Sequence, residues 1–292
     1  MWNRVCIIGK IALIVVLLCF KCLSYSQESS DCDLKFIDHL VNKGDYQEAL
    51  FLLDSSDCLS LHLNDSANYL KGWSLYSLKR LLSSSESLIK VSSASEFYLK
   101  SHFFAAYNFA HIGNYSEALK TFSETNVISE RDISLRNFEI AGVSLLQGNK
   151  TMFEDYYNKT DRKFYELSGS SENIQKIAED LDKHKRKSPV IAGMLSGIIP
   201  GSGKLYAGKK GEAISAFIAA AGLGLVTWEN YRKNGWNSFG TIAFGSAFVF
   251  SYAANIYGAV VTVNVLETEY RNNVKNSILF NLHIPLRNSF DK

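Results

Sequence analysis

The chain has 292 residues, of which 47% are hydrophobic and 21% are charged, and its formal net charge is +2. This length allows one large domain or two modest ones. The nearly balanced charge argues against nucleic acid as a partner, because proteins that bind it usually carry a strong basic excess. The apolar residues are unevenly distributed: the first 26 residues and the stretch from about Val190 to Leu266 are strongly apolar, and the region between them is mixed.

The N-terminal segment, residues 1–26, has the pattern of a signal peptide. Two basic residues precede an uninterrupted apolar run at 11–20, and the small residues Ser24 and Ser26 form a cleavage site at its end. An uncleaved N-terminal anchor is the alternative, because apolar residues continue past Lys21. The pattern predicts that the chain is exported.

The cysteines fit an exported chain. Three of the five lie in the signal segment and would leave with it, whereas Cys32 and Cys58 remain. In an oxidising compartment such a pair forms a disulfide that persists. Cys32 precedes the first expected helix and Cys58 follows the second, and an antiparallel helix hairpin brings these ends together. We therefore expect a Cys32–Cys58 disulfide, with two buried free thiols as the alternative.

The region 27–165 contains an internal repeat. Gly-Asp-Tyr-Gln-Glu-Ala-Leu at 44–50 and Gly-Asn-Tyr-Ser-Glu-Ala-Leu at 113–119 are 69 residues apart, or two periods of about 34. This period predicts further turns near residues 79 and 148. A polar break lies at the first position, and Gly148 can end a helix at the second.

The residues seven positions before each turn support the same register. They are Ile37, Gly72, Ala106 and Ala141. Three of the four are small, which would let antiparallel helices approach closely. The pattern predicts an all-α fold built from a stack of helix-turn-helix repeats.

The Gly-Asp/Asn-Tyr-x-Glu-Ala-Leu motif, repeated at this period, resembles the tetratricopeptide repeat over about residues 34–160. The resemblance is good in the first and third repeats, weak in the second, which lacks the turn Gly and the second-helix Ala, and marginal in the fourth. It implies a right-handed stack of helix pairs whose concave face binds a protein or peptide partner, and it implies no catalytic residue. A helical bundle with coincidental spacing is the alternative.

Residues 166–187 are expected to form a capping helix, from about Glu172 to Lys185, and a basic linker. The run from Lys183 to Lys187 is the densest basic cluster in the chain. Next to an apolar domain, such a cluster is expected to contact anionic lipid headgroups. A solvated helix end that favours cations is the alternative.

An apolar domain follows at 188–270, before a C-terminal tail at 271–292. Its first apolar run, Val190–Ile199, is too short to span a bilayer and ends at a Pro-Gly-Ser-Gly sequence. The runs Ala213–Trp228 and Phe239–Leu266 are separated by a polar loop and predict a Gly/Ala-rich transmembrane helical hairpin in contact with membrane lipids. A buried helical domain of a soluble protein is the alternative.

The glycines of this domain do not form a nucleotide site. Between Gly197 and Gly203 there are five residues rather than four, and Leu205 follows the lysine where a phosphate-binding loop needs Ser or Thr. Tyr206 stands where a dinucleotide fingerprint needs its third glycine. We expect no nucleotide and no other cofactor.

The segment 188–266 resembles a family of bacterial envelope proteins of unknown function. The family pattern is Ser-x-x-x-Pro-Gly-x-Gly-x-x-Tyr-x-Gly, followed by an apolar helix and an Asn-x-Tyr-Gly-Ala element, and Lys204 stands where the family often has Gln. The resemblance implies a structural motif without an established activity. Its residues here are Pro200, Gly201, Gly203, Tyr206, Gly208, Asn255, Tyr257 and Gly258.

The sequence offers no catalytic or metal constellation. Its six histidines are scattered, and His102 and His111 are nine residues apart, which is not the spacing of a metal pair on one helix. The two apolar runs contain no charged residue, which argues against a membrane-embedded enzyme. We expect a non-catalytic, membrane-anchored scaffold of the bacterial cell envelope; an accessory factor in membrane-protein insertion or envelope biogenesis is the main alternative.

Overall fold

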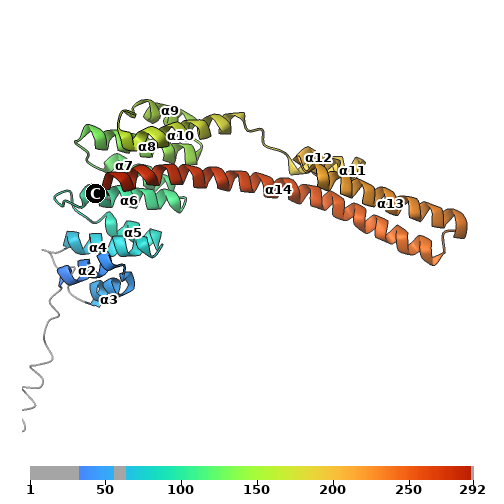
Figure 1. Ribbon diagram of the computed structural model, residues 1–292, viewed down its shortest axis with the longest axis horizontal. Helices are drawn as coiled ribbons and strands as arrows, with labels where there is room; N and C mark the ends of the chain where they lie inside the picture. Colours follow the sequence, from blue (N-terminus) through green and yellow to red (C-terminus); the bar gives the residue numbers. More distant parts are fainter. Residues whose placement is uncertain (1–32, 56–63, 291–292) are drawn as a thin grey trace, which may run out of the picture. The chain divides into compact units, whose positions relative to one another are not determined.

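The computed structural model describes residues 33–55 and 64–290, and every regular element within these ranges is a helix (Figure 1). The prediction of an all-α fold is therefore confirmed. The signal segment, Cys32 and Cys58 lie outside the described residues. The chain divides into two compact units: one extends to Ser168 and takes in the chain again from Leu282, and the other is Gly169–Asn281.

Four consecutive helix pairs form most of the first unit, as the repeat pattern predicts. They are α2 (Leu34–Lys43) with α3 (Tyr46–Ser55), α4 (Asn64–Ser77) with α5 (Leu81–Leu88), α6 (Tyr98–His111) with α7 (Tyr115–Glu124), and α8 (Glu130–Gln147) with α9 (Lys150–Asn158). Helix α10 (Tyr165–Lys183) follows and begins seven residues before the expected start at Glu172.

The four turns within these pairs are conformationally equivalent. Gly44, Gly113 and Gly148 have left-handed backbones, with φ between 80° and 93°, and Lys79 has φ 62° at the corresponding place. In each turn the next residue donates its backbone N–H to the carbonyl five residues earlier, over 2.8 to 2.9 Å. This bond satisfies a carbonyl at the helix end. The turns are 34 or 35 residues apart, so the predicted period is confirmed, including the turn that lacks glycine.

Small residues at the predicted positions allow the helices of a pair to approach closely. A Cβ on Gly72 would lie 2.5 Å from Cγ of Leu88 in the paired helix, and Ala106 and Ala141 are fully buried. Ile37 and Val41 carry the buried stripe of α2, whereas the neighbouring Phe36 is 51% exposed.

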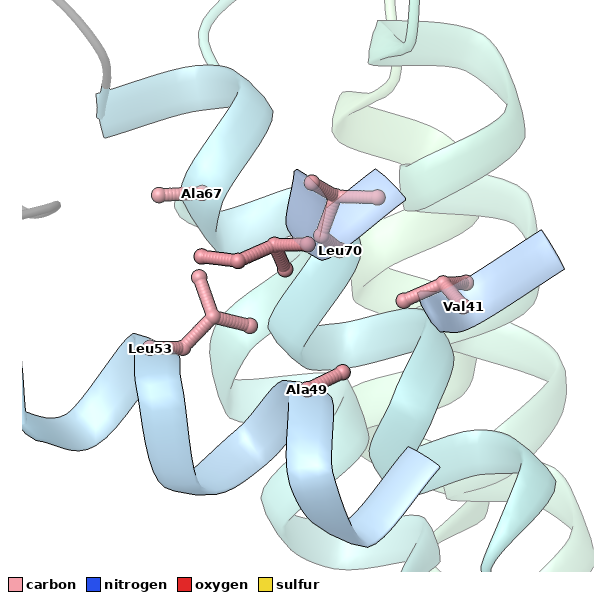
Figure 2. Close-up of a cluster of buried hydrophobic side chains, with 6 residues drawn as sticks. Val41, Ala49, Leu53, Ala67 and Leu70 are labelled. Atoms are coloured by element: carbon pink, nitrogen blue, oxygen red, sulfur yellow. The ribbon is translucent and has the colours of Figure 1, made fainter. Parts of the chain in front are cut away.

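The first two pairs share a buried cluster. Val41 of α2 lies with Ala49 and Leu53 of α3, and Ala67 and Leu70 of α4 cover them from the next pair (Figure 2). The first pair therefore buries its apolar stripe partly against the second, as repeat units require.

The second unit contains the short helices α11 (Pro189–Ile198) and α12 (Ser202–Ala207), followed by α13 (Lys210–Asn234) and most of α14 (Phe239–Phe290). Helices α13 and α14 are long and apolar enough to cross a membrane, and only 11% and 17% of their most apolar stretches is buried. A core helix of a soluble protein would be mostly buried. Helix α11 is apolar but too short to span.

Helices α13 and α14 form the expected hairpin. A Cβ on Gly224 would lie 3.5 Å from the ring of Phe248, and one on Gly245 would lie 3.4 Å from Thr227. Residue numbers rise along one helix as they fall along the other, so the two helices are antiparallel. The residues expected as a C-terminal tail continue α14 to Phe290, and those from Leu282 onward belong to the first unit.

Candidate functional site

The Pro-Gly-Ser-Gly turn is a close-packed joint between three helices. Gly201 has φ 86°, and a Cβ there would overlap the backbone carbonyl of Ala213 in α13. A Cβ on Gly203 would overlap the carbonyl of Ala192 in α11. The Gly203 N–H also donates to Oγ of Ser196 over 3.0 Å. Only glycine fits at either position, so α12 is held directly against the backbones of α11 and α13.

The rest of this motif ends α12 and fastens it to the start of α11. Pro200 precedes the helix in the turn, and Gly208 ends it with φ 93°. The hydroxyl of Tyr206 accepts a hydrogen bond from the backbone N–H of Ser188 over 3.1 Å. Lys187 donates from Nζ to the carbonyl of Ala207 over 3.1 Å. These contacts bring the two ends of the α11–α12 segment together.

The Asn-x-Tyr-Gly-Ala element lies on α14, and some of its residues contact the segment that carries the Pro-Gly-Ser-Gly motif. Gly258 faces α12, where a Cβ would lie 3.6 Å from Cε of Lys204. Asn255 is buried, and neither its amide nitrogen nor its amide oxygen has a hydrogen-bond partner. Tyr257 is 72% exposed and therefore lies on the opposite side of α14. The buried contact between the two elements consists of Ala192, Ala207, Ala259 and Val263, with Tyr206 and Leu266 at its edge.

Gly193 is also a packing position. A Cβ on Gly193 would lie 2.9 Å from Val260 of α14. The hydroxyl of Tyr252 donates to the carbonyl of Gly197 over 2.8 Å. The glycine-rich segment therefore acts as a packing surface for α14.

Glu267 is an unforeseen residue at this joint. Its Oε1 accepts from the backbone N–H of Lys187 over 3.0 Å, and its Oε2 lies 3.0 Å from Nε2 of His184. The hydrogen bond from Lys187, and then that from His184, hold the pKa of the Glu267 carboxyl below its ordinary value. The His184 ring stacks on Tyr270 at 3.7 Å. Two residues of the basic run are thus engaged within the protein, and no local sequence pattern links Glu267 to residues 80 or more positions earlier.

The chemistry of this joint is that of packing and capping. Its tyrosine hydroxyls are engaged with backbone groups, and Lys204 lies 3.8 Å from Glu212. Within 33–55 and 64–290, no group of three or more His, Cys, Asp or Glu side chains is placed to hold a metal ion.

A second candidate site lies on the first helices of the pairs, α4, α6 and α8. We call their contact surface the first-helix face; it comprises Tyr76, Phe103, Phe104, Tyr107, Glu139 and Gly142. The end of α14, residues 282–290, is packed on this face (Figure 1). Residues 271–292 were expected to be a C-terminal tail, so this packing was not predicted.

Aromatic contacts hold the 282–290 segment. Nε2 of His283 lies 2.6 Å from the hydroxyl of Tyr76, and the His283 ring stacks on Tyr107 at 5.1 Å. The ring of Phe290 lies 5.6 Å from that of Phe103. At the other edge, Leu282 packs on Gly142. The first-helix face therefore accommodates a helix along three successive repeats.

Glu139 is a charged residue of this face in an apolar setting. Its side chain is fully buried, and neither carboxyl oxygen has a hydrogen-bond partner. Burial raises the pKa of this carboxyl well above its ordinary value. Burial is also the main cause of the raised pKa of Tyr107, to which Tyr76 and Glu139 contribute. Such an unpaired group is costly and rare in a folded protein.

Comparison with known proteins returned no match among protein-family models, curated proteins or solved structures. The two family resemblances therefore depend on the sequence motifs alone. Any functional assignment depends on the two sites described above.

Proposed function

We propose that this protein is a non-catalytic, membrane-anchored scaffold of the bacterial cell envelope that binds a protein partner through its helix pairs. One observation carries the proposal. The chain joins a unit whose first-helix face holds a helix to a hairpin whose apolar side chains are mostly exposed. The signal-like N-terminal pattern places the repeats outside the cytoplasm in this proposal.

The exposed surface of the hairpin supports the membrane anchor. Large apolar side chains such as Phe217, Ile218 and Phe250 are more than half exposed. Soluble proteins rarely expose apolar patches of this extent. With 25 residues, α13 is about 37 Å long, which exceeds the roughly 30 Å of a bilayer core. Lipid chains would cover these side chains at no desolvation cost.

The basic linker supports contact with the headgroups. Lys185 and Arg186 are exposed, and α11 begins three residues after Arg186. Each cation near an anionic membrane surface contributes about 1 kcal/mol of binding. We propose that these two residues, rather than the engaged His184 and Lys187, contact anionic lipids.

Fractionation of bacterial cells followed by alkaline carbonate extraction tests the anchor. The full-length protein is expected to stay in the membrane pellet, and its release into the soluble fraction would contradict the proposal. Ile218→Asp places a charge on the exposed face of α13, at a cost of about 3 kcal/mol in a bilayer, and should increase release. Ile128→Asp is the control, because Ile128 is 88% exposed against 63% for Ile218 but lies between α7 and α8, outside the hairpin.

A further inference from the structure

We propose that the first-helix face is a binding site for a basic helix of another protein, and that the 282–290 segment occupies this site in its absence. The proposal rests on the proposed function and names the chemistry of the partner. Three features of the first unit support it: the fit of the segment, the unpaired carboxyl of Glu139, and a proline within the segment.

The segment presents one face to the repeats in the manner of a bound amphipathic helix. Leu282, Leu286 and Phe290 are four residues apart and so lie on the same side of α14. Leu282 and Leu286 are fully buried, and Phe290 contacts Phe103. Anchors at this spacing are typical of a helix bound in a groove.

The contacts also give the direction of the segment. His283 lies on Tyr107 and Phe290 lies on Phe103, so the segment runs antiparallel to α6. Helix α8 is the first helix of the next pair and repeats the orientation of α6. Leu282 lies on Gly142, so the residue one turn further along the segment lies at the level of Glu139, one turn earlier on α8. That residue is Leu286.

The occupant and the site are therefore mismatched at one position. Glu139 is buried without a hydrogen-bond partner, and the leucine at its level cannot donate. A lysine or arginine at this position would supply a charge-assisted hydrogen bond to the carboxylate. The basic residue of the segment itself, Arg287, is the next residue along and is exposed. The face thus favours a helix with apolar anchors eight residues apart and a basic residue midway between them.

Pro285 makes the present occupant a weak helix. It lies inside α14, where proline removes a backbone hydrogen bond and crowds the preceding turn. The segment is therefore helical largely because it is docked. A partner helix without proline would not carry this cost and could displace it.

Peptide binding to the full-length protein in detergent tests the inference. The two fluorescent probes are the sequence of residues 276–290 and the same peptide with Leu286→Lys. The receptor carries Leu282→Asp, which undocks its own segment by placing a charge against Gly142 and leaves the first-helix face unaltered. The lysine peptide is expected to bind at least about tenfold more tightly than the parent peptide, because its lysine can donate a charge-assisted hydrogen bond to the buried Glu139 carboxylate.

The same measurement on a receptor that also carries Glu139→Gln is the control. The advantage of the lysine peptide should disappear, and unchanged binding of the parent peptide shows that the variant is folded. Equal binding of both peptides to both receptors would overturn the basic partner and leave the scaffold proposal standing. Binding of neither peptide would overturn the helix-binding face itself, while carbonate extraction would still report separately on the anchor.

Discussion

Leu282 lies so close to Gly142 that no methyl group fits between them. A Cβ on the glycine would overlap one methyl of the leucine and would lie 2.9 Å from its Cγ. Because Cγ is the branch point of the side chain, Leu282 cannot avoid the overlap by rotating one methyl. The absence of a side chain at Gly142 is therefore a condition for docking of the 282–290 segment.

Gly142→Ala is expected to undock this segment. The measurement is hydrogen exchange of the backbone amides of residues 282–290, which should lose most of their protection. Gly169→Ala is the control, since nothing lies within 4 Å of a Cβ there, and protection should be unchanged. Adding Leu282→Ala to Gly142→Ala restores space and should recover part of the protection. Full protection in Gly142→Ala alone would contradict the close contact.

Glu139→Gln should stabilise the repeats at neutral pH and flatten their pH dependence. The pKa of Glu139 is higher in the folded protein than its ordinary value of 4.5. The protonated carboxyl therefore makes its full favourable contribution to the free energy of unfolding below about pH 4.5. This contribution is lost as the pH rises through the folded-state pKa. At pH 7 we expect the free energy of unfolding of the variant to exceed that of the wild type by about 1 to 3 kcal/mol.

Exchange of the α8 amides at pH 5 and pH 7 would measure this difference. The gain should be smaller at pH 5, which is close to the ordinary pKa of 4.5, because less of the stabilising contribution of the protonated carboxyl is lost there than at pH 7. A variant less stable than the wild type at both pH values would mean that Glu139 has a partner in solution.

Lys79→Gly should stabilise the second helix pair. Lys79 adopts the left-handed conformation with φ 62°, which costs a residue with a Cβ about 1 to 2 kcal/mol. Glycine avoids this cost but loses more entropy on folding, so the net gain should be about 0.5 to 1 kcal/mol in a thermal unfolding experiment. Lys79 also lies 5.4 Å over the Tyr76 ring. Lys79→Ala, which removes that contact and keeps the strain, should give no gain.

Gly203→Ala should loosen the helix joint of the second unit. The added methyl would overlap the carbonyl of Ala192, and overpacking of this kind costs about 1 to 3 kcal/mol. The midpoint of thermal unfolding in detergent should fall. Gly222→Ala in α13, where nothing lies within 4 Å, is the control and should leave the midpoint unchanged. Equal midpoints for both variants would show that the joint can open at little cost.

Local signals in the sequence predicted most of the fold. The period predicted the turn at Lys79 without a glycine, because the helices on either side require a reversal there. The two apolar runs predicted the hairpin because the length and composition of a run are local properties of the sequence.

Long-range contacts could not be predicted in this way. His283 meets Tyr76 across 207 positions, and no pattern near either residue indicates the other. The spacing of Leu279, Leu282 and Leu286 is a local sign of an amphipathic helix, and it could have replaced the expectation of a tail. Glu139 lies within a helix, where a charged residue is usually exposed, so its burial had no sequence signal.

The contact between His283 and Tyr76 also sets an order of events during biosynthesis. It can form only after the ribosome has added residue 283, by which time the four helix pairs, α13 and most of α14 have been made. Closing a loop of this size is slow compared with the local folding of helix pairs. A newly made chain therefore passes through an interval in which the repeats are folded and their first-helix face is open, and a partner present in that interval meets no competitor.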